Sequence, residues 1–568
     1  MTGIDCARYV GLITRLMPSA VSLDGAEVYM VSECGRGFPV GEYLVVESPE
    51  ARYLARVRES RVEDVYSIAK TPVLSLQQEL AMGVKYVPRF VRLELVSECS
   101  ASCAPPSTPP AIHSRVRTPE PGEVAAMLSL PQSGIPLGVL AMPSGAEVAG
   151  NAVLLPHDAL RHHVLVVGTT GSGKTTLLKN LALELLGGGK ATVVALDSVG
   201  HFHHLVFNGV RARVVVPATR RDLPRHGGGA RAFARRLARR YLRDAFASFG
   251  VEVRRFRYRY GYVRRGGDAV VRRISVSVEF AKPQASAELE LVPWALATRG
   301  VLRRVHELTG MLTEQARMFY GRIIEEVERR LGGRPTFREI FQFLTGPSEV
   351  QAGGRPLLNY EAISRSLVIH VSTLENIVRA ILAVEESGVV DVSGGGVAVA
   401  EPNYGELFRP GYVAVHLAGA PPMVQRMAVY RLLEGVYRVM GREHLRDRER
   451  TAAVLIDEAH LFFPQARTED EKAAIEAHLT RLTRLGRGRG IGVVFATHMP
   501  DDLNDAVMQL ANTKIVLRSE ERVLERLGVP PQERRFLAAA PAGLAYVKSF
   551  ALRHPVYVRI APRSFHLG

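Results

Sequence analysis

The segment Gly168–Thr175 constrains the fold of this chain more than any other feature. It matches G-x-x-x-x-G-K-[ST] at every fixed position, and it lies between the apolar run His163–Val167 and the helix-forming run Leu177–Leu186. A strand, a glycine-rich loop and a helix in this order bind phosphate, because the glycines let backbone N–H groups surround phosphate oxygens and the helix N-terminus adds a positive field. The sequence therefore predicts a site for a nucleoside triphosphate, ATP or GTP.

Particular side chains of this loop have expected roles at the phosphates. Lys174 is expected to reach the β- and γ-phosphates, and the Thr175 hydroxyl is expected to hold Mg²⁺. The other contacts predicted here for the nucleotide are Gly171, Ser172, Gly173 and Thr176. ATP and Mg²⁺ are thus the expected ligands. A chance match in a glycine-bearing loop is the alternative, which the flanking strand and helix disfavour.

A second motif extends the prediction from binding to hydrolysis. The strand-like run Ala452–Ile456 ends at Asp457 and Glu458. An acidic residue at the carboxyl end of a parallel strand next to the phosphate-binding loop can hold the water shell of Mg²⁺, which is the role predicted for Asp457. Glu458 points in another direction and is predicted to polarise the attacking water. A surface Asp-Glu pair after a core strand is the alternative.

A helix is predicted over Glu471–Leu485, before the next strand. Its apolar stripe consists of Ile475, Leu479, Leu482 and Leu485. Arg484 lies off this stripe, and Arg487 lies in the following loop Gly486–Gly490, which glycine leaves mobile. In ring-shaped ATPases an arginine here can reach the γ-phosphate of a neighbouring subunit, so Arg484 or Arg487 is predicted to complete the neighbour's site. Plain surface arginines are the alternative.

The strand-like run Gly492–Thr497 ends in the polar residue Thr497, and His498 follows it directly. A polar side chain at this point can sense the γ-phosphate, and both residues are predicted to do so. A purely structural His498 is almost equally compatible with the sequence.

Positive charge is concentrated in one block of the chain. The net charge is +16, and the segment Arg211–Arg273 alone carries nineteen arginines, four acidic residues and no lysine. A concentrated basic block favours a polyanion such as nucleic acid through counterion release. Arginines and aromatic residues that can stack on bases interleave within it, and the candidate DNA contacts are Arg254, Arg255, Arg257, Tyr258 and Arg259. A solvated surface insertion is the alternative.

Length and composition set the broad class of protein. A chain of 568 residues is expected to form two to four domains, and its 47% hydrophobic residues are ample for their cores. No apolar run approaches the roughly eighteen residues of a membrane span. Asp5, Arg8 and Arg15 interrupt any apolar core of a signal peptide. We therefore expect a soluble cytoplasmic protein without a membrane segment.

The pattern along the chain predicts an α/β P-loop NTPase with a RecA-like parallel sheet. Residues 1–104 are predicted to form a small β-barrel, and residues 105–160 a linker and lead-in that begins with the proline-rich stretch Pro105–Pro110. The ATPase core is assigned to residues 161–205 and 401–568, and residues 206–400 to an inserted, mainly helical region that carries the basic block. The predicted barrel strands are Tyr9–Leu23, Glu42–Glu47, Tyr53–Val57 and Val91–Val96, the core strands Ala191–Leu196, Tyr412–Leu417, Ala452–Ile456, Gly492–Thr497 and Thr513–Leu517, and the inserted helices Glu314–Leu331 and Glu375–Glu386.

The cysteines Cys6, Cys34, Cys99 and Cys103 all lie in the first fifth of the chain. Reduced core cysteines are the leading interpretation, and a disulfide is the next. A zinc site of four cysteines is the weakest, because the Cys99–Cys103 spacing is not typical of zinc ligands.

Together these motifs resemble the HerA family of archaeal and bacterial DNA-translocating ATPases over most of the chain. The resemblance rests on the ordered set of Gly41–Glu47, Arg161–Lys174, Leu455–His460 and Gly490–Pro500. It places Arg161, at the entry to the loop, among the nucleotide-binding residues. Two positions depart from the family pattern: His201 follows Asp197-Ser198-Val199-Gly200 where the family has Glu, and His498 stands where it has Gln.

The resemblance implies a homohexameric ring with double-stranded DNA in its central pore. It also implies a NurA-type nuclease as partner, and a role in resecting broken DNA ends for recombinational repair. An ATP-gated DNA clamp, or a DNA-segregation motor without helicase activity, is the alternative function. A hexameric motor acting on protein is a third, which the basic block disfavours.

Overall fold

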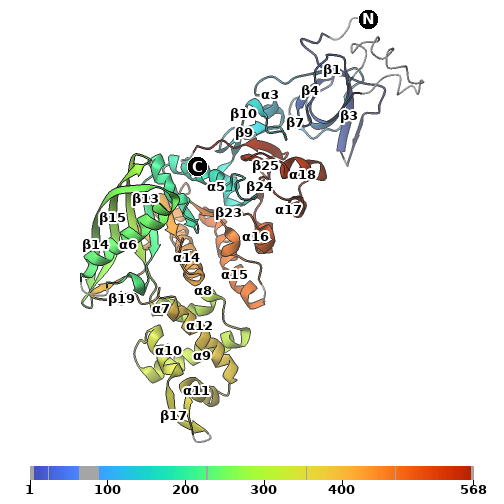
Figure 1. The fold of residues 1–568 in the computed structure, drawn as a ribbon. Helices are drawn as coiled ribbons and strands as arrows, with labels where there is room; N and C mark the ends of the chain where they lie inside the picture. The colour runs from blue at the N-terminus through green and yellow to red at the C-terminus, as the bar shows by residue number, and fades with distance from the viewer. Residues whose placement is uncertain are drawn as a thin grey trace, which may run out of the picture. The chain divides into compact units, whose positions relative to one another are not determined.

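The computed structural model describes residues 5–23, 25–62, 89–224, 228–352, 355–466 and 469–563. By their internal contacts the residues form two compact units (Figure 1). The first unit consists of Met1–Ala159, Val167–Gly173 and Thr513–Ala561, and the second consists of Leu160–Val166, Lys174–Asn512 and Pro562–Gly568. Among the described residues, no helix combines the length and the apolar composition that crossing a membrane requires.

The first unit contains the predicted N-terminal β-barrel. Six of the described strands close into a ring in the order β1-β8-β4-β5-β6-β3, with β3 pairing back onto β1. Inward-facing apolar side chains such as Val28, Leu44 and Val91 are fully buried and form its core. The strands are β1 (Gly11–Ile13), β2 (Ala20–Ser22), β3 (Gly25–Ser32), β4 (Tyr43–Glu47), β5 (Arg52–Val62), β6 (Arg89–Cys99), β7 (Cys103–Ala104) and β8 (Arg115–Arg117).

The barrel differs from the prediction in two places. The predicted single strand Tyr9–Leu23 is wrong, because β1 and β2 are separate short strands in this stretch. The proline-rich stretch that follows residue 104 is not a linker between domains. It connects β7 to β8, and the ring closes only because β8 pairs with both β1 and β4. Proline excludes the intervening residues from strand pairing but does not end the domain.

The cysteines form two disulfide bonds, Cys6–Cys34 and Cys99–Cys103. The leading interpretation of the sequence, reduced cysteines, is therefore wrong. Cys99 and Cys103 end β6 and begin β7, which pair with each other, so the short turn between them brings the two residues face to face. No described cysteine is free to bind a metal ion.

The rest of the first unit is a small antiparallel sheet with short helices. Its strands run in the order β10-β9-β26-β25-β24. Glu533, on α18, is buried and accepts hydrogen bonds from Arg56 of β5 at 2.8 and 3.2 Å and from Tyr557 of β26 at 2.7 Å. The elements are α3 (Glu123–Met127), β9 (Ile135–Ala141), β10 (Glu147–Leu155), β24 (Thr513–Val516), α17 (Glu521–Arg526), α18 (Pro531–Ala538), β25 (Leu544–Ser549) and β26 (Val556–Arg559), and α4 (His157–Arg161) leads into the second unit.

The second unit is built on a mostly parallel sheet in the order β11-β23-β22-β12-β21-β13-β16-β15-β20-β19. The pairings from β23 to β16 are all parallel. The strands are β11 (Val164–Val167), β12 (Ala191–Asp197), β13 (Ala212–Pro217), β14 (Glu252–Arg265), β15 (Asp268–Lys282), β16 (Ala285–Trp294), β19 (Ser393–Gly394), β20 (Val397–Ala398), β21 (Gly411–His416), β22 (Thr451–Ile456) and β23 (Ile491–Thr497). This confirms the predicted α/β class, although β23 lies between the strand of the phosphate-binding loop and the strand that precedes Asp457.

Helices fill the connections between these strands. Two helices of the inserted region have capped N-termini: Thr313 accepts from the Ala316 N–H at the start of α9, and Thr336 and Glu339 form a capping box at the start of α10. The helices are α5 (Lys174–Gly187), α6 (Gly229–Ala245), α7 (Thr298–Val301), α8 (Val305–Thr309), α9 (Glu314–Leu331), α10 (Phe337–Thr345), α11 (Asn359–Leu367), α12 (Val371–Glu386), α13 (Tyr404–Leu407), α14 (Pro422–Arg446), α15 (Glu469–Leu482) and α16 (Asp505–Leu510), and a small hairpin joins β17 (Pro347–Ala352) to β18 (Arg355–Leu358).

The inserted region is helical in only part of its length. Both predicted helices are present, as α9 and α12, and α9 to α12 pack together in the lower part of Figure 1. The stretch Glu252–Trp294, by contrast, forms the three long strands β14, β15 and β16. Its alternation of arginine with Phe256, Tyr258 and Tyr260 has the period of two that a strand requires.

The predicted helix after the acidic pair is also shorter than expected. Helix α15 ends at Leu482, and Ile475, Leu479 and Leu482 are buried as predicted. Leu485 is 52% exposed, so it does not belong to the apolar stripe. The loop predicted to be mobile contains a short 3₁₀ turn, Arg487–Arg489.

A buried histidine joins the start of β11 to its neighbour β23. His163 accepts a hydrogen bond from the Val493 N–H at Nδ1 (3.2 Å), and its Nε2 lies 3.2 Å from the Thr483 carbonyl oxygen. An acceptor at Nδ1 and a donor at Nε2 define a neutral imidazole with its proton on Nε2. Burial lowers the pKa of His163 to about 4, and burial likewise lowers the pKa of His204 to about 4.

These histidines predict a loss of stability in mild acid. Between the unfolded pKa of about 6.5 and the folded pKa near 4, the unfolded chain binds protons that the folded chain does not, so the free energy of unfolding falls as the pH falls through this window. Each histidine contributes up to about 1.4 kcal/mol per pH unit. We expect His163→Asn, which keeps an acceptor near the Nδ1 position, to flatten the dependence of the denaturation midpoint on pH between 7 and 5. An unchanged slope, equal to that of the exposed-site control His157→Gln, would contradict this assignment.

Candidate nucleotide and nucleic-acid sites

The loop that follows β11 has a backbone that favours glycine. Gly171 and Gly173 have φ values of 75° and 111°, which side chains rarely tolerate. Within the first unit the Thr169 N–H donates to the Arg518 carbonyl at 2.8 Å, and the Gly543 N–H donates to the Ser172 carbonyl at 2.9 Å. Ser172 Oγ is buried and has no hydrogen-bond partner among the described residues. A buried hydroxyl that lacks a partner fits a loop shaped for phosphate oxygens.

The helix that begins after this loop brings Thr175 next to Asp457, which follows β22. These two residues are the predicted Mg²⁺ ligands. The Thr175 hydroxyl donates to Asp457 Oδ2 at 3.1 Å. Asp457 is 4% exposed, and burial together with the nearby carboxylates of Glu458 and Asp197 raises its pKa to about 6. Lys174 is also buried, which lowers its pKa against the opposing attraction of Glu458 and Asp457. Thr175 and Asp457 offer only oxygen ligands, which suits Mg²⁺. Its positive charge would offset the repulsion among the neighbouring carboxylates.

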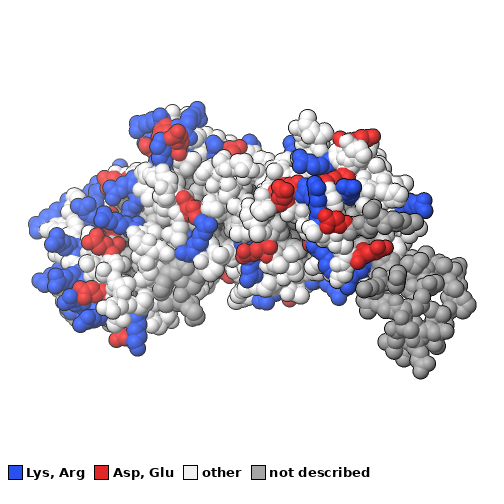
Figure 2. Space-filling model, turned by 90° about the horizontal axis from the view of Figure 1, so that it is seen from above, with Lys and Arg blue, Asp and Glu red and all other residues white. Residues whose placement is uncertain are grey.

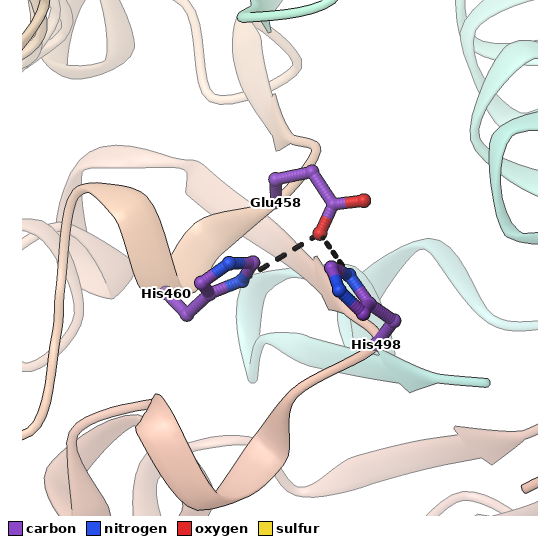
Figure 3. A group of neighbouring side chains, drawn as sticks. All are labelled: Glu458, His460 and His498. Atoms are coloured by element: carbon purple, nitrogen blue, oxygen red, sulfur yellow. Dashed lines mark hydrogen bonds and ion pairs between the residues drawn. The ribbon is translucent and has the colours of Figure 1, made fainter. Parts of the chain in front are cut away.

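Glu458 is turned out of the strand by its backbone. Its φ of 51° and ψ of 52° lie in the left-handed region, which costs a residue other than glycine on the order of 1 kcal/mol. The turn separates the Glu458 side chain from that of Asp457 and brings it to His498, whose Nδ1 lies 2.7 Å from Glu458 Oε2 (Figure 3). The predicted base and one predicted sensor are therefore in contact. The other predicted sensor, Thr497, is fully buried, and its Oγ1 lies 3.0 Å from Nδ1 of His460.

Sequence reasoning missed two residues of this pocket as site residues. Lys179 lies one turn along α5 from Thr175 and is 2% exposed, and its pKa is lowered to about 8 by burial despite the attraction of Asp197 and Asp457. His460 contacts both Thr497 and Glu458. The spacing of four residues that places Lys179 on the same helix face as Thr175 was a signal in the sequence. Nothing comparable marked His460, whose contacts depend on the order of the strands.

Three predicted arginines lie away from this pocket within the chain. Arg161 is in the last turn of α4, before β11, whereas the loop follows the other end of β11. The predicted contact of Arg161 with the nucleotide therefore stays a prediction. Arg484 and Arg487 are exposed and precede β23, while Thr497 ends that strand. Their predicted contact with the site of a neighbouring subunit stays a prediction.

The basic block forms a surface on α6 and the β14–β15 hairpin. Figure 2 shows Lys and Arg side chains gathered at the left end of the molecule, on the side where Figure 1 draws these elements. A groove of roughly 1000 Å³ runs between α6 and β14, and six arginines but no carboxylate line it: Arg231, Arg235, Arg236, Arg239, Arg254 and Arg255. Phe256 and Tyr258 also line this groove. Arg225, another member of the basic block, lies outside the described residues.

The predicted DNA contacts divide between two grooves. Arg254, Arg255 and Tyr258 line the groove beside α6, whereas Arg257 and Arg259 point with Tyr258 toward a second groove of roughly 910 Å³ that also contains Glu288 and Glu290. The first groove is the better site for a polyanion, because it lacks carboxylates. The arginines of α6 were not singled out from the sequence, although they recur at helical spacing along one face.

Comparison with protein families matches two models to this chain. "Helicase HerA, central domain" matches residues 141–376, and "Helicase HerA-like C-terminal" matches residues 420–518. Together these segments span more than half of the chain and contain the phosphate-binding loop, the acidic pair and both predicted sensors.

Comparison with individual proteins gives a partial relative and several distant structures. The "DNA double-strand break repair helicase HerA" of Pyrococcus furiosus is 30% identical over 115 residues, which is 19% of this chain and 20% of that protein. The chain thus matches about a fifth of that relative's length. VirB4 of Thermoanaerobacter pseudethanolicus is 13% identical with a TM-score of 0.42, covering 76% of this chain and 97% of that one. The bacterial conjugative coupling protein TrwB, in complex with ADP and Mg²⁺, is 16% identical with a TM-score of 0.41, covering 74% and 89%.

Proposed function

Because the chain belongs to the HerA family, we propose that it is a DNA-dependent ATPase that uses ATP hydrolysis to move double-stranded DNA through a homohexameric ring. The contact that carries the proposal is the hydrogen bond from Thr175 to Asp457, with Glu458 held one residue further on. It joins the end of the phosphate-binding loop to an acidic pair 282 residues away in the sequence. This is the arrangement that separates nucleotide binding from water activation.

In this proposal each residue of the pocket has a distinct task. Backbone N–H groups of Gly171–Gly173 and the ammonium of Lys174 bind the phosphates, and the unpartnered Ser172 hydroxyl is available to them. Thr175 and Asp457 would hold Mg²⁺, which neutralises charge on the phosphate oxygens. Glu458 accepts the proton of the attacking water once its hydrogen bond to His498 is broken. Thr497, at the end of β23, senses the γ-phosphate. Arg484 or Arg487 completes the site of the neighbouring subunit.

The groove between α6 and β14 supports double-stranded DNA as the polymer that stimulates hydrolysis. We expect Arg235→Gln, Arg239→Gln and Arg254→Gln together to reduce the slope of log affinity against log salt, because each lost phosphate contact lowers it by about 0.9. The measurement is duplex binding across a salt series. The control replaces three exposed arginines of the helical region, Arg317, Arg322 and Arg334, and removes the same charge.

The outcomes of this salt series separate the possible DNA contacts. A reduced slope in the groove variant alone supports contact at α6 and β14. Equal slopes in both variants and the wild type would place the DNA elsewhere in the ring. ATPase rates measured with and without duplex then test the coupling: stimulation by duplex supports a DNA-dependent ATPase, whereas none would favour a motor that acts on protein.

The cellular role proposed for this activity is the resection of broken DNA ends together with a NurA-type nuclease. It is supported by the named function of the Pyrococcus furiosus relative and by family membership. Purification of the chain with a bound nuclease activity that requires its ATPase would support this role. An ATPase that moves DNA but recruits no nuclease would favour the alternative, a segregation motor.

A further inference from the structure

Three side chains beside the ATPase pocket converge in a way that their proposed roles in hydrolysis do not require. Glu458, His460 and His498 each offer one ligand atom, and these atoms lie within 4.8 Å of one another (Figure 3). Nδ1 of His498 is 2.7 Å and Nδ1 of His460 is 3.5 Å from the same oxygen, Glu458 Oε2. Ligands bound to one zinc-like ion at about 2.0–2.2 Å are separated by similar distances.

The sheet holds these side chains in place. Glu458 and His460 follow β22, and His498 follows β23, which is its parallel neighbour. The backbone of Glu458 is also held, since its N–H donates to Asp457 Oδ1 at 3.1 Å, and Nδ1 of His460 lies 3.0 Å from Thr497 Oγ1, a contact that a bound ion would replace. The His498 side chain is 35% exposed, so an ion can enter from solvent.

The donor set distinguishes this cluster from the predicted Mg²⁺ site. Two imidazoles and one carboxylate suit Zn²⁺, Co²⁺ or Ni²⁺, whereas Mg²⁺ prefers oxygen ligands such as those of Thr175 and Asp457. The surrounding charge also favours a cation, since Asp457 and Asp502 face the cluster and Lys174 is the opposing positive group. Three protein ligands would leave a fourth position open to water or to a phosphate oxygen.

We propose that Glu458, His460 and His498 form a binding site for a divalent transition-metal ion, and that an ion bound there inhibits ATP hydrolysis by occupying Glu458. The inhibitory part rests on the proposed ATPase function, while the metal site itself does not. An ion that takes the Glu458 oxygen as a ligand removes the group that would accept the proton from water. The two histidines thereby make hydrolysis sensitive to transition metals in the presence of Mg²⁺.

Metal binding is tested first, without nucleotide. Untagged full-length protein is titrated with Co²⁺ in excess Mg²⁺, and the visible d–d absorption of the bound ion is recorded; Zn²⁺ is then added as a competitor. We expect saturation at one ion per chain, and a loss of affinity of at least about tenfold in His498→Gln and in His460→Gln. The control His370→Gln removes an exposed histidine whose side chain makes no capping bond. Equal titrations for the wild type and His498→Gln would overturn the metal site.

Inhibition is tested second, with ATP, Mg²⁺ and rising Zn²⁺. The wild type and His370→Gln should lose activity over the range in which they bind Zn²⁺, whereas His498→Gln should keep its own basal rate over that range. Metal binding without inhibition would overturn the inhibitory role. A protein that binds Co²⁺ but never hydrolyses ATP would contradict the proposed function instead, and ATPase activity without Co²⁺ binding would contradict only the metal site.

Discussion

Glu458→Gln is expected to bind ATP with nearly wild-type affinity and to hydrolyse it about 10² to 10⁴ times more slowly, the usual cost of losing a positioned base. The amide keeps the size of the side chain and still accepts the bond that His498 donates, so the pocket should retain its shape. The measurement combines nucleotide binding at equilibrium with single-turnover hydrolysis.

Lys174→Ala is the matched comparison for this variant. Removing the buried ammonium should weaken ATP binding itself, because Lys174 is the side chain predicted to reach the β- and γ-phosphates. Loss of binding in one variant and loss of turnover in the other would separate the two motifs. If Glu458→Gln turned over ATP at the wild-type rate, another residue would have to be the base.

An arginine supplied by the neighbouring subunit is expected to have an equally large effect. Alanine at Arg484 or at Arg487 should leave ATP binding nearly unchanged, and one of the two should lower hydrolysis by about 10³ to 10⁵, the range typical of such residues. Both side chains are exposed at the amino end of β23 and lie away from the pocket of their own chain. Arg448→Ala is the control, since Arg448 is exposed and precedes the neighbouring strand β22.

Mixing variants tests whether the arginine acts between subunits. The inactive arginine variant and Lys174→Ala each damage a different half of an interface, so mixed rings should contain some intact sites and recover part of the activity. Failure to recover activity at every mixing ratio would mean that the arginine acts within its own chain or has no role in hydrolysis.

The parts of the fold predicted from sequence are those with strong local signals. The strand, glycine loop and helix around Lys174, the strand before Asp457 and the strand before His498 were all placed correctly. Each is a run of apolar residues bounded by a motif with a fixed geometry. The HerA resemblance was also confirmed by the family models.

The errors have physical causes. The proline-rich stretch after residue 104 was taken for a linker, because its composition indicates that these residues do not pair with a strand. Composition does not reveal that the later strand β8 returns to close the barrel. The arginines of β14 were assigned to a mainly helical region, although their alternation with aromatic residues has the period of a strand.

The cluster at Glu458 shows what sequence reasoning could not reach. Glu458 and His498 are 40 residues apart, and their contact depends on β22 and β23 being parallel neighbours. It depends as well on the left-handed backbone of Glu458, which no residue preference predicts for glutamate. Both facts appear only once the strands are assembled.

The central claim, that hydrolysis moves the protein along double-stranded DNA, is tested most directly by displacement of a third strand from a long duplex. A triplex-forming oligonucleotide is placed far from the loading end, and its release is followed with ATP and Mg²⁺. We predict ATP-dependent release by the wild type, and none by Glu458→Gln. Duplex-stimulated hydrolysis that leaves the third strand in place would contradict translocation and identify the protein as an ATP-gated clamp.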